Sequence, residues 1–500
     1  MRPDVTCPCI IMRHGGLDGV ALQKEEYFGL LQKLDIDMHV VSGRQERAYT
    51  EEESRGRAFT IVERLDFHHP ASKLLFANQF REGPETEGVA RIDKGEWLKL
   101  FAEHRRAIYE AIDEVLRSIP RNTPVLVYNL VSLRHAHPAA AVALRDLMRK
   151  YPKRGFLSHS ADPDAERPEK IERIHDWALE VISANEPGEP YNGGPYREPN
   201  LSHIVLNPTQ RANFVLKYDV PSEQVFEIPD FLEFPGKEPP IAAAPEAGFL
   251  EEIAAKAVVP DGDGFRYEGT AIDEETVFFL SPVRPVYRKR LIEAMQVAHA
   301  YAVSRQERVA FVVTHPNLDD PSYFRETVRF AAGLGLTYLH LDEPTIERLD
   351  RVYENLAPLR TAGIVASSAG GWENALNEMA RWCIPFAMAA RLNSYPPLTR
   401  QMDVKTFGMR FRFLTDLGRI KPVEAIRDLD LTIAPHMTPL LKWIDQALDP
   451  MSRRELVEHN YRCARRHLGL RPTAIRLLEA ILKIYTRLGV PDAEVEADQA

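Results

Sequence analysis

A glycine pair followed by polar and acidic residues offers the clearest chemistry in this sequence. Gly370 and Gly371 come after a short apolar run, and the apolar residues of 375–380 then recur at helical spacing. Glycine has no Cβ, and the first N–H groups of a helix have no intrahelical partner, so this junction can bind phosphate. Glu378 lies two turns into the expected helix and could reach a sugar hydroxyl beside that phosphate. The alternative is an ordinary junction whose glycines only turn the chain.

A second group of residues is basic. Arg284, Arg288 and Lys289 lie between the apolar run 277–280 and a helical segment that extends to about residue 303. Guanidinium and ammonium groups are suited to phosphate oxygens. The loop therefore indicates an anion site, and the alternative is a solvated basic turn.

A third group is compact. His159, Asp162, Glu166 and Arg167 fall within nine residues that begin at the end of an expected strand. The coincidence of His159 with the other three residues favours a ligand site. For His159 alone, the alternative is a plain histidine at a strand end.

Two Asp-x-Asp pairs could suggest a metal site. Asp162-Pro-Asp164 and Asp261-Gly-Asp263 have the Asp-x-Asp spacing that metal-dependent transferases use. Two carboxylates alone make a poor Mg²⁺ site, since that ion usually relies on substrate phosphates as well. We expect neither an essential metal nor another cofactor.

A glycine-containing loop joins the first expected strand to the first helix. Gly15, Gly16 and Asp18 lie in this loop, which follows the carboxyl end of the strand. The glycine spacing does not match a dinucleotide-binding fingerprint. Without further context, such a loop is more often a turn than a site.

Taken in order, these segments resemble the motifs of the retaining glycosyltransferases of family 4. The resemblance covers about residues 8 to 470 in outline. The Asn374-Ala375 form of the donor signature is closest to the branch of mannosylglucosylglycerate and glucosylglycerate synthases. The residues in register with the donor signature are Ser367, Gly371, Trp372, Asn374, Ala375, Glu378 and Pro385. One departure is that the first Glu of the family's pair falls on Gly370, while Glu373 stands three residues later.

The resemblance implies a role for each group of residues. It assigns catalysis to His159, Arg288 and Lys289, with the two cations meeting the donor diphosphate and the histidine lying against the sugar or the acceptor. It assigns Glu378 to the ribose. The other donor-binding residues that it implies are Arg284, Gly370, Gly371, Trp372, Glu373 and Asn374, and the residues near the acceptor are Gly15, Gly16, Asp18, Asp162, Glu166 and Arg167.

The elements that must position these groups alternate between strand and helix. Apolar runs predict strands at 9–12, 38–41, 125–128, 155–158, 203–206 and 225–228, and then at 277–280, 309–313, 338–341, 364–366 and 384–388. This pattern predicts an α/β fold of parallel sheets covered by helices. The resemblance implies two Rossmann-like domains facing a cleft, the GT-B fold, with C-terminal helices closing the chain. Its last N-domain segment is Ile-Pro-Asn, where this chain has Asp230. We expect domains at 1–234 (acceptor) and 273–465 (donor), a linker with an insertion at 235–272, and a terminal helix with an acidic tail at 466–500.

The composition argues against some classes of binding partner and indicates a cellular compartment. The formal net charge of −10 over 500 residues argues against nucleic acid as the main partner, because such binding needs a basic surface. Four scattered cysteines indicate a reducing cytoplasm rather than a disulfide framework. We find no signal peptide and no apolar run of about 18 residues, so we expect no transmembrane segment. The sequence carries no signal for oligomeric state.

The function that these patterns predict is transfer of a hexose from a nucleotide sugar to a small acceptor, with retention implied by the resemblance. A glycerate-type anion is the acceptor that the branch implies, and Arg13 and Arg167 are candidate contacts for it. Two alternatives stay open. One is a related epimerase or phosphorylase on the same architecture. The other is a catalytically silent nucleotide-sugar-binding subunit, which Gly370 favours.

Overall fold

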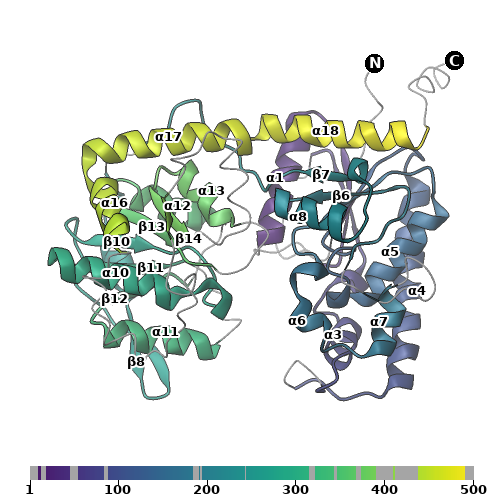
Figure 1. The fold of residues 1–500 in the computed structure, drawn as a ribbon, viewed down its shortest axis with the longest axis horizontal. Coiled ribbons are helices and arrows are strands. Elements are labelled where there is room, and N and C mark those ends of the chain that lie inside the picture. Colours follow the sequence, from purple (N-terminus) through teal and green to yellow (C-terminus); the bar gives the residue numbers. More distant parts are fainter. Residues whose placement is uncertain are drawn as a thin grey trace. The chain divides into compact units, whose positions relative to one another are not determined.

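In the computed structural model the chain forms two compact units (Figure 1). Unit 1 comprises Met1–Asp230 and Arg471–Ala500, and unit 2 comprises Phe231–Leu470. The structure describes residues 9–12, 19–44, 55–83, 88–183, 191, 194–241, 244–314, 321–342, 346–367, 373–389, 409–411 and 437–489. No helix among these residues is long and apolar enough to cross a membrane.

Unit 1 is built on a parallel sheet of seven strands. The strand order is β3-β2-β1-β4-β5-β6-β7. The bounds are β1 Cys9–Met12, β2 Met38–Ser42, β3 Arg57–Ile61, β4 Val125–Tyr128, β5 Phe156–His159, β6 Leu201–Val205 and β7 Val225–Glu227. Every residue of β4, β5 and β6 is buried, as expected for central strands covered on both faces. The residues that follow β5 therefore lie at the carboxyl edge of the sheet, directly after a buried strand.

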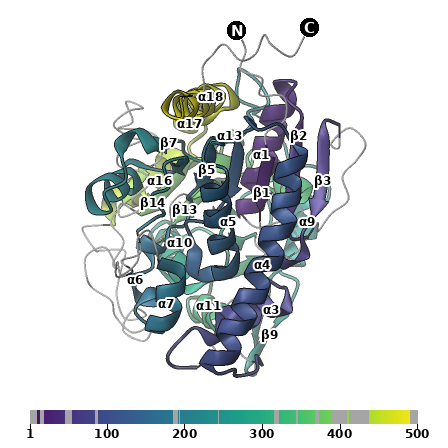
Figure 2. The ribbon, with the colours of Figure 1, turned by 90° about the vertical axis from the view of Figure 1, so that its right-hand side faces the viewer.

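Unit 1 also contains helices. They are α1 Gly19–Lys33, α3 Pro70–Asn78, α4 Lys94–Ser118, α5 Pro138–Lys150, α6 Pro168–Ile171, α7 Asp176–Ser183, α8 Pro208–Ala212 and α18 Leu470–Arg487. Helices α4 and α5 pack against each other, as Figure 2 shows. A capping box between Asp93 and Glu96 fixes the start of α4. Trp97 is fully buried there and donates a hydrogen bond from Nε1 to the carbonyl oxygen of Leu75 at 2.9 Å.

Helix α18 completes unit 1 from the far end of the chain. Its residues Ala474, Leu477 and Ile481 face apolar residues of α1, β1, β4 and β5 around a small apolar cavity of about 30 Å³. Gly155 permits this close packing, because a Cβ at that position would lie 2.6 Å from Cγ2 of Ile484.

Unit 2 contains a second parallel sheet, of six strands. The order is β12-β11-β10-β13-β14-β15. The bounds are β10 Val277–Leu280, β11 Val309–Val313, β12 Thr337–His340, β13 Thr361–Val365, β14 Phe386–Ala389 and β15 Met409–Phe411. Its helices are α10 Leu291–Arg305, α11 Pro321–Gly333, α12 Ile346–Leu356, α13 Asn374–Arg381, α16 Thr438–Leu448 and α17 Pro450–Leu468. Strands β10 and β13 are neighbours, so the loops that follow them share one edge of the sheet.

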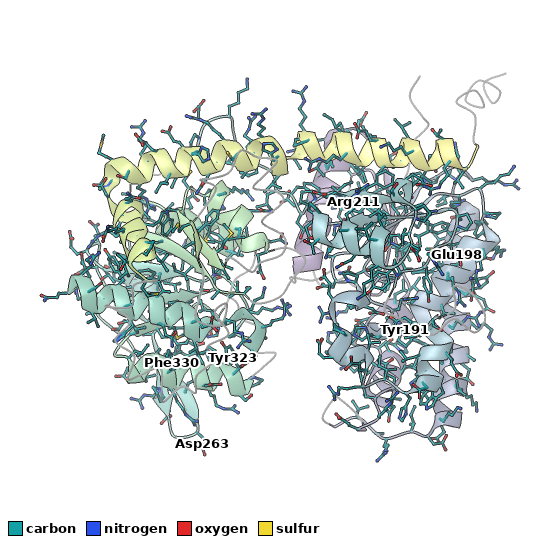
Figure 3. The ribbon with its side chains drawn as sticks, viewed as in Figure 1. Tyr191, Glu198, Arg211, Asp263, Tyr323 and Phe330 are labelled. Carbon is teal, nitrogen blue, oxygen red and sulfur yellow. The ribbon has the colours of Figure 1, made fainter. Side chains whose placement is uncertain are left out.

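The segment predicted to be a linker and insertion, residues 235–272, contains α9 Phe249–Ala254 and the hairpin of β8 Val258–Asp261 and β9 Gly264–Tyr267. An antiparallel bridge joins Ala257 to Leu339, and an ion pair of 2.7 Å joins Lys256 to Asp342. The hairpin thus covers the edge strand β12, while Asp263 marks its exposed tip (Figure 3).

The predicted α/β class and both parallel sheets are confirmed, and most strands agree with their predicted positions within a few residues. Two strands, β3 and β15, and helix α3 were not anticipated. The described helix after the glycine pair begins at Asn374 rather than at Gly370, because Glu373 still has extended backbone angles (φ −117°, ψ 97°).

Candidate functional site

The basic loop of unit 2 connects β10 to α10 through a single helical turn. Residues Tyr287–Lys289 form a 3₁₀ turn that is closed by a bond of 2.8 Å from the amide of Lys289 to the carbonyl oxygen of Val286. Arg290 then caps α10 with left-handed backbone angles (φ 53°, ψ 43°), a conformation that residues other than glycine seldom adopt. The chain is thereby turned so that Lys289 is buried.

Lys289 forms an ion pair with Glu373, across 84 positions of sequence. Its Nζ lies 2.5 Å from Oε1 and 2.6 Å from Oε2 of the carboxylate. The two side chains are only 9% and 4% exposed. Burial lowers the pKa of Lys289 to about 8; Glu373 opposes this shift, while Arg288 and Arg284 add to it. Arg284 and Arg288 therefore lie near enough to Lys289 for their charges to act on it.

Helix α13 carries the other predicted donor residues. Its first residue, Asn374, is half-buried, and among the residues that the structure describes its Oδ1 has no hydrogen-bond partner. Glu378, one turn later, accepts a hydrogen bond of 2.5 Å from the hydroxyl of Tyr353 on α12. A second bond, of 3.0 Å, runs from Nε1 of Trp382, the residue that follows α13, to Asp350 on α12. The predicted ribose contact is thus held in place by its neighbour helix.

In unit 1, His159 ends β5 inside an aromatic cluster. Its ring stacks on Tyr128 with centroids 4.8 Å apart and meets the edge of Tyr27 at 5.8 Å. His159 is 2% exposed, and its Nε2 lies 3.6 Å from Oδ1 of Asp230. Neither ring nitrogen has a hydrogen-bond partner among the described residues. Burial lowers the pKa of His159 to about 4.

The loop after β5 folds back on itself. Arg167 donates to Oδ1 of Asp162 at 3.0 Å, and the side chain of Asn129 accepts from the amide of Asp162 at 3.3 Å. Glu166 keeps a large exposed fraction, yet burial around its carboxyl group raises the pKa to about 7. The loop therefore presents the carboxyl groups of Asp162 and Glu166 and the guanidinium of Arg167, and the hydrogen bond to Asn129 holds its backbone.

A buried network that sequence reasoning missed supports this loop from below. Asp164 is fully buried and accepts hydrogen bonds from Nδ1 of His135 and from the hydroxyl of Tyr191, which is labelled in Figure 3. The guanidinium of Arg134 lies 4.7 Å above the ring of Tyr191 and 4.4 Å above that of Tyr196. No spacing signal links these residues, because they come from separate segments of the chain.

Other side chains contact the carboxylates of both Asp-x-Asp pairs. Asp164 belongs to the buried network, Asp162 pairs with Arg167, and Asp263, at the tip of the unit 2 hairpin, contacts Arg329 on α11. Within the described ranges, no group of three or more histidine, cysteine, aspartate or glutamate side chains is arranged to hold a metal ion.

The structure thus forms two clusters from the predicted residues. Unit 1 gathers His159, Asp162, Glu166 and Arg167 around one loop, and unit 2 gathers Arg284, Arg288, Lys289, Glu373, Asn374 and Glu378 on the β10 and β13 side of its sheet. Gly15, Gly16, Asp18, Gly370, Gly371 and Trp372 lie outside the described residues.

Comparisons with known proteins point in one direction. No protein-family model matches the chain. Over 471 residues the chain is 22% identical to the mannosylglucosylglycerate synthase of Thermotoga maritima, and the alignment covers 92% of this chain and 95% of that protein.

Solved structures show the fold. The UDP-forming α,α-trehalose-phosphate synthase of Burkholderia vietnamiensis superposes with a TM-score of 0.57 at 12% identity, covering 97% of this chain and 100% of that one. The sucrose-phosphate synthase of Thermosynechococcus elongatus gives 0.57 at 11% identity, with coverages of 96% and 99%. The chain therefore has the GT-B architecture of two Rossmann-like domains.

Proposed function

We propose that this chain is a glycosyltransferase that moves a hexose from a nucleotide-sugar donor to a small, anionic, glycerate-type acceptor, with retention of anomeric configuration. The observation that carries the proposal is the cluster of Arg284, Arg288 and Lys289 at the carboxyl edge of the unit 2 sheet. Ligands of open α/β folds bind at that edge. The likeness to a mannosylglucosylglycerate synthase and to sugar-phosphate synthases supports the same class of reaction.

Unit 2 holds the donor in this proposal. When the bond between the sugar and the diphosphate breaks, negative charge grows on the leaving phosphate oxygen. Cations that are already in place stabilise such charge without reorganisation. The basic loop supplies them, and the start of α13 adds the positive end of a helix. Glu378, fixed by Tyr353, is the carboxylate proposed for the ribose hydroxyls.

Unit 1 holds the acceptor. Arg167 offers a guanidinium to an anionic group of the acceptor, and its pairing with Asp162 fixes its direction. His159, uncharged because of its burial, is proposed to lie against the transferred sugar or the acceptor. The retaining mode and the glycerate-type acceptor rest on the resemblance of the motifs, and the Thermotoga protein's name supports the acceptor class.

The test is a panel of UDP-, GDP- and ADP-sugars with the pure full-length protein. Thermal shift reports binding, and release of nucleoside diphosphate reports turnover with and without glycerate, phosphoglycerate and glucosylglycerate. NMR of the product gives its anomeric configuration. We expect one donor to stabilise the protein and to release its diphosphate only when an acceptor is present. We also expect this release to persist in EDTA.

Two variants test whether the basic loop of unit 2 binds the donor. We expect Arg288→Met to weaken donor binding and to abolish most of the release. The matched control is Arg308→Met, whose exposed ion pair with Asp273 lies before β11 at the opposite edge of the sheet. Donor binding without release from any acceptor would instead establish the silent subunit. Absence of stabilisation by every nucleotide sugar overturns the proposal.

A further inference from the structure

Asn129 has a backbone conformation that residues with side chains seldom adopt. It follows directly after β4, at the carboxyl edge of the unit 1 sheet, and its φ is 52°. Glycine would adopt this left-handed conformation at lower cost. Asparagine is one of the few other residues that tolerate it, and it adds a polar side chain that glycine lacks. Contacts of that side chain can offset the cost of the backbone.

Both the backbone and the side chain of Asn129 contact the segment that ends β5 and begins the following loop. Its amide donates to the carbonyl oxygen of His159 at 3.0 Å. Its Oδ1 accepts from the amide of Ala161 at 2.9 Å and from that of Asp162 at 3.3 Å. Only the oxygen of a side-chain amide can accept from two N–H groups, so these bonds fix its orientation. Asn129 thus holds the chain from the end of β5 to Asp162.

Gln210 holds the same loop from the other side. It lies on α8, after β6, and is only 1% exposed. Its Nε2 donates to the carbonyl oxygen of Ala161 at 3.2 Å, and its Oε1 accepts from the amide of Leu206 at 2.8 Å. Strands β4 and β6 flank β5 in the sheet. The side chains of Asn129 and Gln210 therefore form an amide clamp, which binds the N–H of Ala161 from one flank and its C=O from the other.

The amide clamp lies next to charged groups of the candidate acceptor site. Arg167 donates to Oδ1 of Asp162 at 3.0 Å, so the direction of its guanidinium depends on where the backbone of Asp162 lies. The two side chains of this ion pair are 30% and 31% exposed, and ion pairs of partly exposed side chains contribute little by themselves. The amide clamp, rather than the ion pair, therefore fixes the start of the loop.

We propose that Asn129 and Gln210 are positioning residues for the acceptor. Their side-chain amides fix both peptide groups of Ala161. The fixed backbone then holds Asp162 and Arg167 in the arrangement that binds the acceptor. This inference rests on the proposed function. Neither amide touches the acceptor, and both act through the backbone of the loop, whose displacement by a small distance is enough to weaken productive binding.

The experiment compares two variants of Asn129 in the full-length protein. Asn129→Gly removes Oδ1 but suits the left-handed backbone, so it should keep the melting temperature. We expect its acceptor KM to rise about tenfold and its donor Kd to change by less than about twofold. Asn129→Asp keeps Oδ1 and loses the Nδ2 donor. We expect its acceptor KM to stay within about threefold of the wild type at about 0.5 M salt, which screens the added charge.

The matched control is Asp35→Gly, which replaces another left-handed residue of unit 1 (φ 55°) at an exposed position and should change neither constant. Hydrogen exchange measured by mass spectrometry reports the clamp itself. We expect the amides of Ala161 and Asp162 to exchange about tenfold faster in Asn129→Gly and to keep the wild-type rate in Asn129→Asp.

The other half of the clamp is tested by Gln210→Met, which should raise the acceptor KM in the same way. Should this variant fail to fold, Gln210→Glu takes its place, because it keeps the acceptor of the Leu206 amide and removes only the donor to Ala161. An unchanged acceptor KM in the folded variant would remove Gln210 from the proposal.

Three outcomes overturn the role of Asn129. If Asn129→Asp raises the acceptor KM as much as Asn129→Gly does while exchange stays slow, the side chain contacts the acceptor directly. Unchanged exchange in Asn129→Gly would show that the bonds do not hold the loop. Faster exchange with an unchanged KM would show that the loop's position does not serve the acceptor. A wild type that releases no nucleoside diphosphate with any acceptor would instead refute the proposed function, so the two failures are distinguishable.

Discussion

The Nε2 atom of His159 lies 3.6 Å from Oδ1 of Asp230, and both side chains are almost fully buried. Burial lowers the pKa of the histidine to about 4 and raises the pKa of the aspartic acid to about 8. Near pH 7 the two side chains are therefore uncharged, with the proton on Asp230. The position is suited to a neutral hydrogen-bonding side chain, which gives a physical reason for the asparagine that is usual in the related Ile-Pro-Asn segment.

Asp230→Asn should stabilise the protein at alkaline pH. The carboxyl group has a raised pKa in the folded state, so folding holds a proton that the unfolded chain releases above about pH 4. Stability is then lost as pH rises through the range from about 4 to 8. We expect Asp230→Asn to remove that loss and to gain about 1–3 kcal/mol at pH 8.5. Urea unfolding at pH 5 and pH 8.5 measures it.

The control for this comparison is Asp263→Asn at the exposed tip of the hairpin. We expect its effect on the free energy of unfolding to be the same at both pH values. A variant Asp230→Asn that is no more stable than the wild type at pH 8.5 would show that the carboxyl group is ionised in the folded protein.

Buried histidines should make unit 1 sensitive to acid. His104 accepts from Arg64 at 3.0 Å and contacts Ser72 at 3.1 Å, and burial lowers its pKa to about 3. The unfolded chain takes up a proton below about pH 6.5 that the folded histidine refuses, so stability falls as pH falls. Each such group costs about 2 kcal/mol between pH 7 and pH 5.

The variant that tests this is His104→Gln, which keeps a polar side chain without a titrating ring. We expect it to be less stable than the wild type at pH 7 and to lose less stability between pH 7 and pH 5. His39→Gln is a second test, because burial also lowers the pKa of this half-buried histidine, and the variant should likewise lose less stability than the wild type between pH 7 and pH 5. An unchanged slope of stability against pH in His104→Gln would contradict the assignment.

Gln306→Gly should stabilise unit 2. Gln306 caps the C-terminus of α10 with left-handed backbone angles (φ 53°, ψ 40°), which cost a side-chain-bearing residue free energy that glycine does not pay. We expect a gain of about 0.5–1 kcal/mol, measured by chemical denaturation. Gln306→Ala keeps the Cβ and removes the rest of the side chain, so it should give no gain. Equal stability of both variants would place the effect in the side chain instead.

Local apolar runs were enough to predict most of the two sheets. The segment 277–280 is Val-Phe-Phe-Leu and lies fully buried in β10. Strand β3, Arg57–Ile61, was missed because it mixes charged, polar and apolar residues and stays partly exposed at the sheet edge. Tertiary pairing, rather than local pattern, makes that segment a strand.

The candidate site shows the same limit. His159, Asp162, Glu166 and Arg167 could be found because they share one short loop. The residues that pack around them could not be found in this way. Asp230, for example, lies beside His159 in the fold but 71 positions further along the chain. Likewise, Lys289 and Glu373 were both singled out, but their pairing follows only from the adjacency of β10 and β13 in the sheet.

Asp164→Asn should impair use of the acceptor more than binding of the donor. Asp164 anchors the loop that carries Asp162 and Arg167, and it balances the buried cation of Arg134, whose Nε lies 3.9 Å away. Removing one charge of a buried group destabilises a protein by about 3–5 kcal/mol. The loop should then loosen while unit 2 keeps its structure, because Asp164 belongs to unit 1.

Steady-state kinetics with varied acceptor, together with donor titration, separate these effects. We expect Asp164→Asn to raise the acceptor KM by about tenfold while the donor Kd changes by less than about twofold. Asp176→Asn is the matched control, since its ion pair with Arg81 is exposed on the same unit and should change neither constant. A purely structural role would lower the unfolding temperature alone, and an equal loss of donor affinity would place the loop's action elsewhere. The split between the two constants therefore decides whether the buried network positions the acceptor.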